Sequence, residues 1–189
     1  MPRLTVNDRP VEFDLDPEMP LLYAIREALN LTGTKSGGGG DCSCGVCMVI
    51  VDGTALRSCK ITLAEAEGRY VTTIEGLSRD RSHPVQQAMV ANQAIQCGFC
   101  TPGIVMAAAA LLQRNASPSK ADIIEAIPNM CRCGVYPRLV ETVQQAGRAL
   151  RNLEAIEPEA APPGTSATEA AETVPAITDP NESNGGSNP

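Results

Sequence analysis

Eight cysteines gathered in two tight groups constrain this chain of 189 residues more than any other feature. Neighbouring thiols separated by so few residues rarely suit a disulfide framework, whereas they suit a metal centre. We therefore expect two sites with four thiolates each, and the fold must bring each group together. The first group is Cys42, Cys44, Cys47 and Cys59, and the second group is Cys97, Cys100, Cys131 and Cys133.

The second group stands at the predicted starts of two helices. Residues 96–103 read Gln-Cys-Gly-Phe-Cys-Thr-Pro-Gly, which predicts a Cys-x-x-Cys pair at the mouth of a helix. Pro102 suits the first helical turn because its missing N–H costs nothing there, and Gly98 lets the backbone curl so that both sulfurs face one point. The Cys-x-Cys pair stands in the same place before another helix. Free N–H groups and partial positive charge at helix N-termini favour thiolates and anionic clusters.

The first group follows a run of four glycines in residues 36–41, which is too glycine-rich for a regular element. Three cysteines come directly after this run, and the fourth follows 12 positions after the third. Plant-type ferredoxins use a similar arrangement, in which a loop supplies three thiolates and a later strand supplies one. Residues without a Cβ allow backbone N–H groups to point at the sulfides of an anionic cluster. We therefore favour an iron–sulfur cluster for this group.

Zinc is the alternative for both groups, because Zn²⁺ also takes four thiolates. Structural zinc sites usually combine two Cys-x-x-Cys knuckles, and the glycine run before three crowded cysteines is a poor knuckle. The spacing of the second group alone is less decisive between zinc and iron–sulfur. A Rieske centre is excluded, because it needs two histidines and His83 is the only one. His83 precedes a proline, so we expect it to begin a helix rather than to act as a ligand or base.

The hydrophobic pattern predicts an α+β chain with a sheet-containing first half and a helical second half. We expect an N-terminal ferredoxin-like domain of the β-grasp type over residues 1–76, a linker over 77–82, a small four-helix-bundle domain over 83–153, and a disordered acidic tail over 154–189. The predicted strands are residues 4–6, 11–15, 48–51, 55–59 and 70–74, with hairpin turns at 7–10 and 52–53. The predicted helices are residues 21–29, one beginning at 83–84, 103–112, 120–127 capped by Ser117 or Ser119, and 137–150.

The formal net charge of −7 belongs to the tail. From Asn152 onward the chain holds seven acidic residues and no Lys or Arg, which leaves 15 acidic and 15 basic residues in the body. A neutral body with no basic run and few aromatic residues does not favour a nucleic-acid surface. The first residues lack the pattern of a secretory signal, and no apolar run approaches 18 residues, so we expect a cytoplasmic location.

Eight short runs together carry a resemblance to a known family. They are residues 34–35, 45–47, 51–53, 58–59, 73–77, 83–86, 96–103 and 129–134. Over residues 4–150 the chain resembles the small iron–sulfur subunit of the xanthine oxidase family of molybdenum hydroxylases. The run Cys-Arg-Cys-Gly-Val-Tyr-Pro-Arg at residues 131–138 is similar to the isoquinoline oxidoreductase and aldehyde dehydrogenase branch.

The resemblance implies two 2Fe–2S clusters, each held by one cysteine group. The cluster of the second group would lie nearest the molybdopterin of a large partner subunit, with Gln96 and Cys133 approaching the pterin. The other cluster would pass electrons to a flavoprotein or a cytochrome c that serves as the electron acceptor. The partner would oxidise an aldehyde or N-heterocycle with oxygen from water, so this chain would carry no catalytic residue. Large subunits of this branch are sometimes exported, so the small subunit would then reach the periplasm with its partner.

The first group departs from the family pattern Cys-x4-Cys-x2-Cys. Five positions before Cys44 stands Gly39, whereas Cys42 stands only two before it. We expect Cys42 still to be the first ligand, because the glycine run can rearrange to deliver it and four thiolates are the norm.

Two other classes of function are consistent with the cysteines alone. A free ferredoxin-like electron shuttle would need an acidic docking face, which the neutral body does not favour. A zinc-binding interaction module would be colourless, whereas iron–sulfur protein is red-brown.

Overall fold

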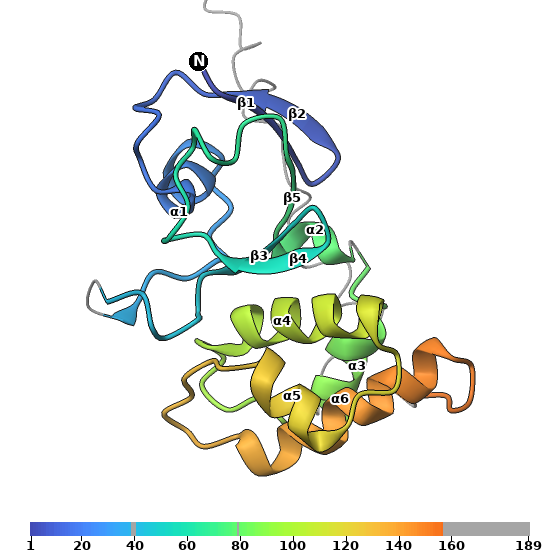
Figure 1. Cartoon of the computed structure of the whole chain (residues 1–189). Helices are drawn as coiled ribbons and strands as arrows, with labels where there is room; N and C mark the ends of the chain where they lie inside the picture. Colours follow the sequence, from blue (N-terminus) through green and yellow to red (C-terminus); the bar gives the residue numbers. More distant parts are fainter. Residues whose placement is uncertain (39–40, 79, 157–189) are drawn as a thin grey trace, which may run out of the picture. The chain divides into compact units, whose positions relative to one another are not determined.

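The computed structural model describes residues 1–38, 41–78 and 80–156, and it begins with a five-stranded sheet (Figure 1). The strands are β1 (Arg3–Val6), β2 (Arg9–Glu12), β3 (Met48–Val51), β4 (Thr54–Arg57) and β5 (Tyr70–Thr72). Their order across the sheet is β2-β1-β5-β3-β4, with β1 and β5 parallel and the other pairs antiparallel. The sheet and the helices that follow it confirm the predicted α+β class.

Both hairpin turns contain residues with positive φ, as two-residue turns of this kind require. Asp52 and Gly53 have φ of 49° and 79°, which confirms the predicted turn between β3 and β4. Asn7 and Asp8 form the other turn, with φ of 49° and 67°. The prediction placed Pro10 in that turn, but it lies in β2. A proline is tolerated there because β2 is an edge strand.

One apolar helical segment covers the sheet core, as the spacing over residues 21–29 predicts. It consists of α1 (Leu21–Tyr23), which continues as a π-helical turn, η1 (Ala24–Ala28). Leu21 and Ile25 are fully buried in the same cluster as Val71 of β5. The segment therefore closes the core of the first half.

The strand predicted over residues 70–74 ends earlier than expected. Thr73 is the N-cap of a short helix, α2 (Ile74–Leu77), so Ile74 begins a helix. The helix also occupies the start of the segment predicted as a linker from residue 77. Its position is fixed by Glu75, whose carboxylate accepts the N–H of Gly33 at 2.7 Å.

Four helices form the second half, as predicted. They are α3 (Pro84–Ala91), α4 (Thr101–Arg114), α5 (Lys120–Ala126) and α6 (Tyr136–Leu150). His83 caps α3 by accepting the N–H of Val85 at Nδ1, 3.2 Å away, which confirms its helix-start role. Ser119, rather than Ser117, caps α5 through a reciprocal capping box with Asp122.

The strand β3 joins the two halves because all four of its residues are buried. Successive side chains of a strand point to opposite faces. Val49 and Val51 belong to the cluster that contains α1, whereas Met48 and Ile50 belong to the apolar cluster built around α4. Figure 1 shows β3 between α1 and α4. Ten consecutive residues of α4 are buried, from Gly103 to Leu112, so this helix is the centre of the second core.

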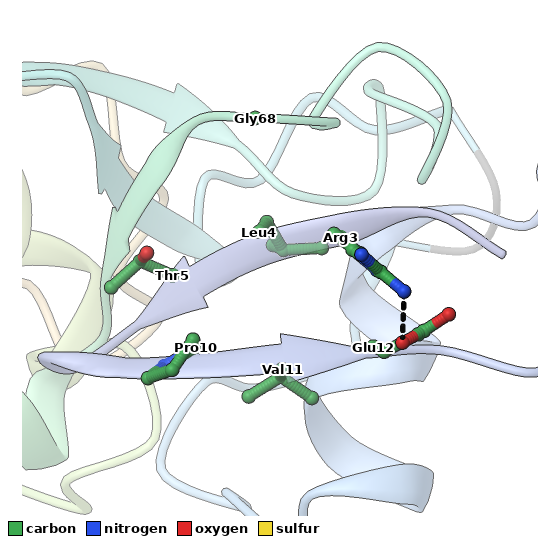
Figure 2. Close-up of a pocket in the computed structure, with 7 residues that line it drawn as sticks. All are labelled: Arg3, Leu4, Thr5, Pro10, Val11, Glu12 and Gly68. Carbon is green, nitrogen blue, oxygen red and sulfur yellow. Dashed lines mark ion pairs between the residues drawn. The ribbon is translucent and has the colours of Figure 1, made fainter.

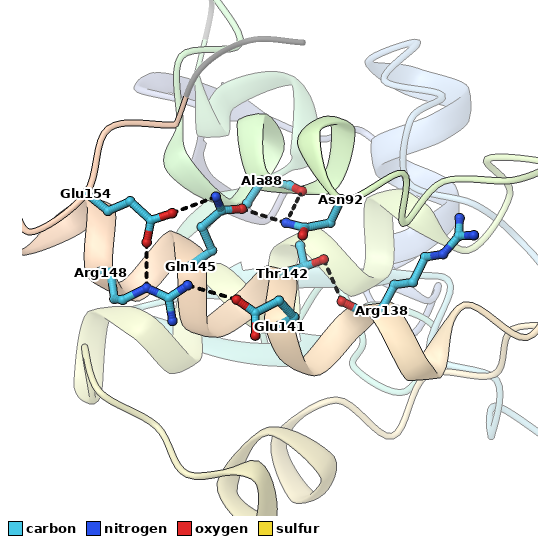
Figure 3. A network of polar contacts seen from close by, with 8 residues as sticks. All are labelled: Ala88, Asn92, Arg138, Glu141, Thr142, Gln145, Arg148 and Glu154. Carbon is cyan, nitrogen blue, oxygen red and sulfur yellow. Dashed lines mark hydrogen bonds and ion pairs between the residues drawn. The ribbon is translucent and has the colours of Figure 1, made fainter.

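A polar network ties α3, α6 and the following residues together (Figure 3). Arg148 contacts Glu141 at 2.8 Å and Glu154 at 2.5 Å, and Gln145 contacts both Glu154 and Asn92. Ile156 is also buried in the helical core. Residues 154 and 156, which we predicted to begin the tail, therefore contact the folded part, and residues 157–189 lie outside the described residues. Among the described helices, none is long and apolar enough to cross a bilayer.

Candidate metal centres

Three thiols of the first group lie together at the end of the loop. The Sγ atoms of Cys47 and Cys59 are 3.3 Å apart, and the Sγ of Cys42 lies 3.8 Å from the carbonyl oxygen of Cys59. Burial raises the pKa of the Cys59 thiol above its ordinary value of 9.0, and hydrogen bonds with Cys42 and then Cys47 raise it further. These three neighbouring thiols supply part of a site with several thiolate ligands.

The fourth thiol of this group, Cys44, is buried against the glycine run. Gly38 has a φ of +77°, and a Cβ built on it would lie 2.9 Å from the Sγ of Cys44. A Cβ on Gly37 would lie 3.7 Å from the same sulfur. Glycine therefore allows the main chain to fold closely over this thiol, in agreement with the reason inferred from the sequence for a glycine loop at an anionic cluster.

The second group lies at two helix starts, as the sequence predicts. Cys100 is the N-cap residue of α4, with Pro102 in the first turn, and Val135 is the N-cap residue of α6. Gly98 and Gly134 have φ of +80° and +74° next to the thiols, and no described atom would meet a Cβ at either position. The two glycines therefore serve the backbone turns rather than close packing.

Main-chain N–H groups lower the pKa of the Cys131 thiol. Burial raises the pKa of this thiol, but the N–H groups of Val135, Cys133 and Gly134 and a hydrogen bond with Cys100 outweigh burial, so the pKa is lowered overall. Several N–H groups at the start of a helix favour an anionic sulfur in this way.

The other thiols of the second group are linked in pairs. A hydrogen bond from the N–H of Phe99, followed by one with Cys133, lowers the pKa of Cys97. Burial and then a hydrogen bond with Cys131 raise the pKa of Cys100 to about 12. Contacts therefore run between Cys97 and Cys133 and between Cys100 and Cys131, so the structure brings all four predicted residues together.

Main-chain contacts join the two groups. The N–H of Met130, next to Cys131, donates to the carbonyl of Cys44 at 2.9 Å. The buried side chain of Asn129 donates to the carbonyl of Gly45 at 2.7 Å. A Cβ on Gly103 would lie 2.4 Å from that same carbonyl oxygen, so α4 approaches the first loop closely. Sequence reasoning missed the contact between Asn129 and Gly45, because the two residues are 84 positions apart in the chain.

The hydroxyl of Tyr136 ties the two ends of the Cys131 loop together. It accepts the N–H of Cys131 at 2.6 Å and donates to the carbonyl of Asn129 at 3.2 Å. In the sequence this residue marks only the start of a helix, and nothing there indicates its second role.

The residues predicted to face a pterin are at the surface. Gln96, Cys97 and Cys133 are exposed, whereas Cys100 and Cys131 are buried. Large apolar side chains beside them are also exposed, with Phe99 at 49% and Met130 at 59%. One edge of the second group is therefore open and the other is enclosed by protein.

The thiols of the second group lie in two contacting pairs. In the first group, Cys42, Cys47 and Cys59 lie together and Cys44 lies against the glycine run. Within residues 1–38, 41–78 and 80–156, no group of three or more His, Cys, Asp or Glu side chains is placed to hold a single metal ion. A structural zinc ion requires four ligands about 2.0–2.3 Å from one centre. The glycine backbone beside the first group and the helix N–H groups beside the second suit an anionic iron–sulfur cluster.

The surface hollow on the first hairpin has a different character (Figure 2). It lies along β1 and β2, and the ion pair of Arg3 and Glu12 crosses its rim at 3.0 Å. Both side chains of the pair are exposed, and none of the lining residues is a cysteine. The hollow does not contribute to either thiol group.

The fold and the two thiol groups define a two-cluster iron–sulfur protein, and comparisons with known proteins agree. Residues 4–73 match the model of the "2Fe-2S iron-sulfur cluster binding domain", and residues 73–144 match that of the "[2Fe-2S] binding domain". The chain is 48% identical to a nicotinate dehydrogenase subunit of Pseudomonas putida over 151 residues, which cover 78% of this chain and 95% of that protein. It is 45% identical to the alpha chain of isoquinoline 1-oxidoreductase from Brevundimonas diminuta, with 76% and 95% covered. The chain belongs to the small iron–sulfur subunits of the xanthine oxidase family of molybdenum hydroxylases.

Solved structures show the same architecture. The aldehyde oxidoreductase of Desulfovibrio desulfuricans superposes with a TM-score of 0.77 at 38% identity, over 83% of this chain and 18% of the longer one. Quinoline 2-oxidoreductase of Pseudomonas putida 86 superposes with a TM-score of 0.73 at 35% identity, over 81% of this chain and 96% of the matched chain. The predicted family and fold are therefore confirmed.

Proposed function

We propose that this chain is the electron-transfer subunit of a molybdenum hydroxylase and that all eight cysteines ligate its two 2Fe–2S clusters. Electrons would come from the molybdopterin centre of a large partner chain and leave through this one to an external acceptor. Each cluster supplies one-electron chemistry when bound. The observation that carries the proposal is that the second set lies in contacting pairs and that Cys42, Cys47 and Cys59 lie together. The hydrogen bond from Met130 to Cys44 joins the two loops.

The surroundings of the thiols support distinct positions for the two sets. The second set has exposed members, Cys97 and Cys133, with Gln96 beside them, so a partner's cofactor can approach it closely. We therefore assign this set to the side of the large subunit, and Gln96 and Cys133 to contact with the pterin. The first set would face the acceptor, which we propose to be a flavoprotein or a cytochrome c subunit.

The protein tunes such sites through burial and through hydrogen bonds to sulfur. Burial raises the pKa of both thiols, but main-chain N–H groups lower that of Cys131 overall, whereas hydrogen bonds with Cys42 and Cys47 raise that of Cys59 further. N–H donors stabilise added negative charge, so the two sets would differ in reduction potential. The thiols themselves carry no catalytic step, and the substrate would bind entirely on the partner.

Purification of the native complex tests the function. We expect a large molybdopterin-containing chain to copurify with this subunit, and dithionite reduction to bleach the iron–sulfur absorbance. Addition of the partner's substrate should then produce the same bleaching only in the intact complex. A red-brown protein that purifies alone and is not reduced by any large subunit would support a free shuttle instead. A colourless zinc protein would contradict both.

The cellular location follows from the partner. We propose the cytoplasm or, by co-export with the large subunit, the periplasm. Fractionation of cells that express both subunits decides between them, because both chains should appear in one compartment. Recovery of the two chains in different compartments would contradict a stable complex.

A further inference from the structure

The cysteine that departs from the family spacing has an unusual backbone conformation. Cys42 has a φ of +55°, in the left-handed region that residues other than glycine seldom adopt. Conformations of this kind persist where the surrounding structure enforces them, and they cluster at functional sites. The position of Cys42 in this region therefore requires a local cause.

The cause is a side-chain turn that encloses Cys42. One carboxylate oxygen of Asp41 accepts the N–H of Ser43 at 3.0 Å, and the other accepts the Ser43 hydroxyl at 2.7 Å. The N–H of Asp41 donates to the carbonyl of Gly38 at 3.3 Å. An aspartate that bonds the backbone two residues ahead forms a compact turn of the type that tolerates left-handed geometry. Asp41 therefore holds Cys42 in its conformation.

The turn directs the Cys42 thiol to the other members of the first set. Its Sγ lies 3.8 Å from the carbonyl oxygen of Cys59 and within hydrogen-bonding distance of the Cys59 thiol. The Cys59 thiol is in turn 3.3 Å from that of Cys47. The half-buried Cys42 thus lies on the same side of the loop as two of the ligands proposed above.

We propose that Cys42 is the relocated first ligand of the N-terminal cluster, delivered by the Asp41 turn rather than from within the glycine run. This inference rests on the proposed function, because it assumes that the first set holds a cluster. Ligation replaces the S–H bond of Cys42 with an S–Fe bond and releases the proton to solvent, with no change in the oxidation state of sulfur. Asp41 is a positioning residue: it shapes the loop without contacting the iron.

The variants Cys42→Ala and Cys42→Ser, in the full chain coexpressed with its partner, test the ligand role. Ser36→Ala is the matched control, since it changes an exposed serine at the start of the same loop and keeps every thiol and the Asp41 turn. The readouts are iron and acid-labile sulfide per chain and the EPR spectrum of the reduced protein. We expect Cys42→Ala to retain about half of the iron and to lose one of two EPR signals. Cys42→Ser should lose the same signal or shift it, because an alkoxide oxygen replaces sulfur, and Ser36→Ala should keep both signals unchanged.

The second cluster serves as an internal control for folding. A retained second signal shows that the loss at the first set is local. If Cys42→Ala loses both signals, Cys42→Ser decides: a first-set signal that is lost or shifted while the second is retained supports the ligand role, and an unchanged first-set signal contradicts it. Full iron content with two unchanged signals in both Cys42 variants would overturn the ligand role. The proposed function fails separately: wild-type protein without iron would contradict it before any variant is compared.

The positioning role of Asp41 has its own test. Asn can accept the Ser43 N–H in the same turn, whereas Ala cannot. We expect Asp41→Ala to lower occupancy of the first cluster and to broaden its EPR signal, and Asp41→Asn to restore both. Equal spectra for wild type and Asp41→Ala would show that the turn does not position the ligand.

Discussion

The two thiol sets solve the same chemical problem with different local structure. The second set uses the starts of α4 and α6, where unsatisfied N–H groups of the main chain act on Cys131. The first set uses a loop, in which Gly38 folds over Cys44 and Asp41 turns the chain at Cys42. A helix start provides donors wherever its residues allow the helix to begin, whereas a loop depends on particular side chains and glycines. The helical site therefore keeps an ordinary motif, and the loop site is the one whose spacing has changed.

The largest expected effect is the separate loss of each cluster. Cys131→Ser removes a thiolate that receives main-chain N–H donors, so it should empty the second site. Cys47→Ser should empty the first site, since Cys47 is paired with Cys59 at 3.3 Å. Each variant should retain about half of the iron and the opposite EPR signal. If either substitution removes both clusters while the chain stays folded by circular dichroism, the two sites are not independent, and the comparison fails.

The contact between the halves should produce the next largest effect. A Cβ on Gly103 would lie 2.4 Å from the carbonyl oxygen of Gly45, which is main chain and cannot move away cheaply. We expect Gly103→Ala to destabilise the holoprotein by about 3 kcal/mol, lowering Tm by roughly 6–12 °C.

Gly53→Ala is the matched control for this substitution. Gly53 has a φ of +79° and no described atom within 4 Å of a built Cβ, so only backbone strain should arise, at a cost of about 1 kcal/mol. Thermal melts followed at the cluster absorbance compare the two variants. An equal or larger effect at Gly53 would show that the approach of α4 to the loop is not tight.

A smaller effect should follow from Asn129→Ala. The substitution removes the shorter of two hydrogen bonds to the buried Gly45 carbonyl, which keeps the bond from the Met48 N–H at 3.3 Å. We expect a loss of about 1–2 kcal/mol, together with a slower transfer of electrons between the clusters if the loops separate. Thermal unfolding measures the first effect, and freeze-quench EPR after substrate addition measures the second. The exposed variant Gln113→Ala, in α4, should change neither quantity.

The smallest expected effect is a dependence on pH at the start of α3. Burial lowers the pKa of His83 below its ordinary value of 6.5, and Nδ1 must be unprotonated to accept the Val85 N–H. The stabilisation is therefore fully present above pH 6.5 and is lost as pH falls through the lower pKa of the folded state. Melting at pH 7 and pH 5 should show a larger decrease in Tm for wild type than for His83→Asn, which keeps a capping side chain without a titration in this range. Equal decreases would contradict the role of the cap.

Much of this fold could be predicted from local signals. The two cysteine groups, the Pro102 helix start and the Asp52-Gly53 turn each depend on residues that are close in sequence. The boundary at Ile74 was wrong because Thr73 caps a short helix whose position depends on the contact of Glu75 with Gly33. The junction at Asn129 was missed for a related reason: hydrophobic periodicity does not show which distant loops meet. Long-range polar contacts between loops therefore require the structure.

At Cys42, by contrast, the sequence showed that something was unusual and the structure explains it. The spacing alone identified an anomaly, and the family pattern placed the expected ligand elsewhere in the loop. The structure supplies a physical mechanism, since the Asp41 turn and the left-handed backbone bring the thiol to Cys59. A changed motif is thus compatible with an unchanged number of ligands when the local backbone compensates.

Metal and sulfide analysis of the purified wild-type complex, with EPR of the same sample after reduction, tests the central claim most directly. Two clusters of two irons each require four irons and four acid-labile sulfides in this chain, with two distinct EPR signals at about one spin each. We expect this result, with no stoichiometric zinc in the chain. Zinc in place of iron, or iron without acid-labile sulfide, would contradict the account.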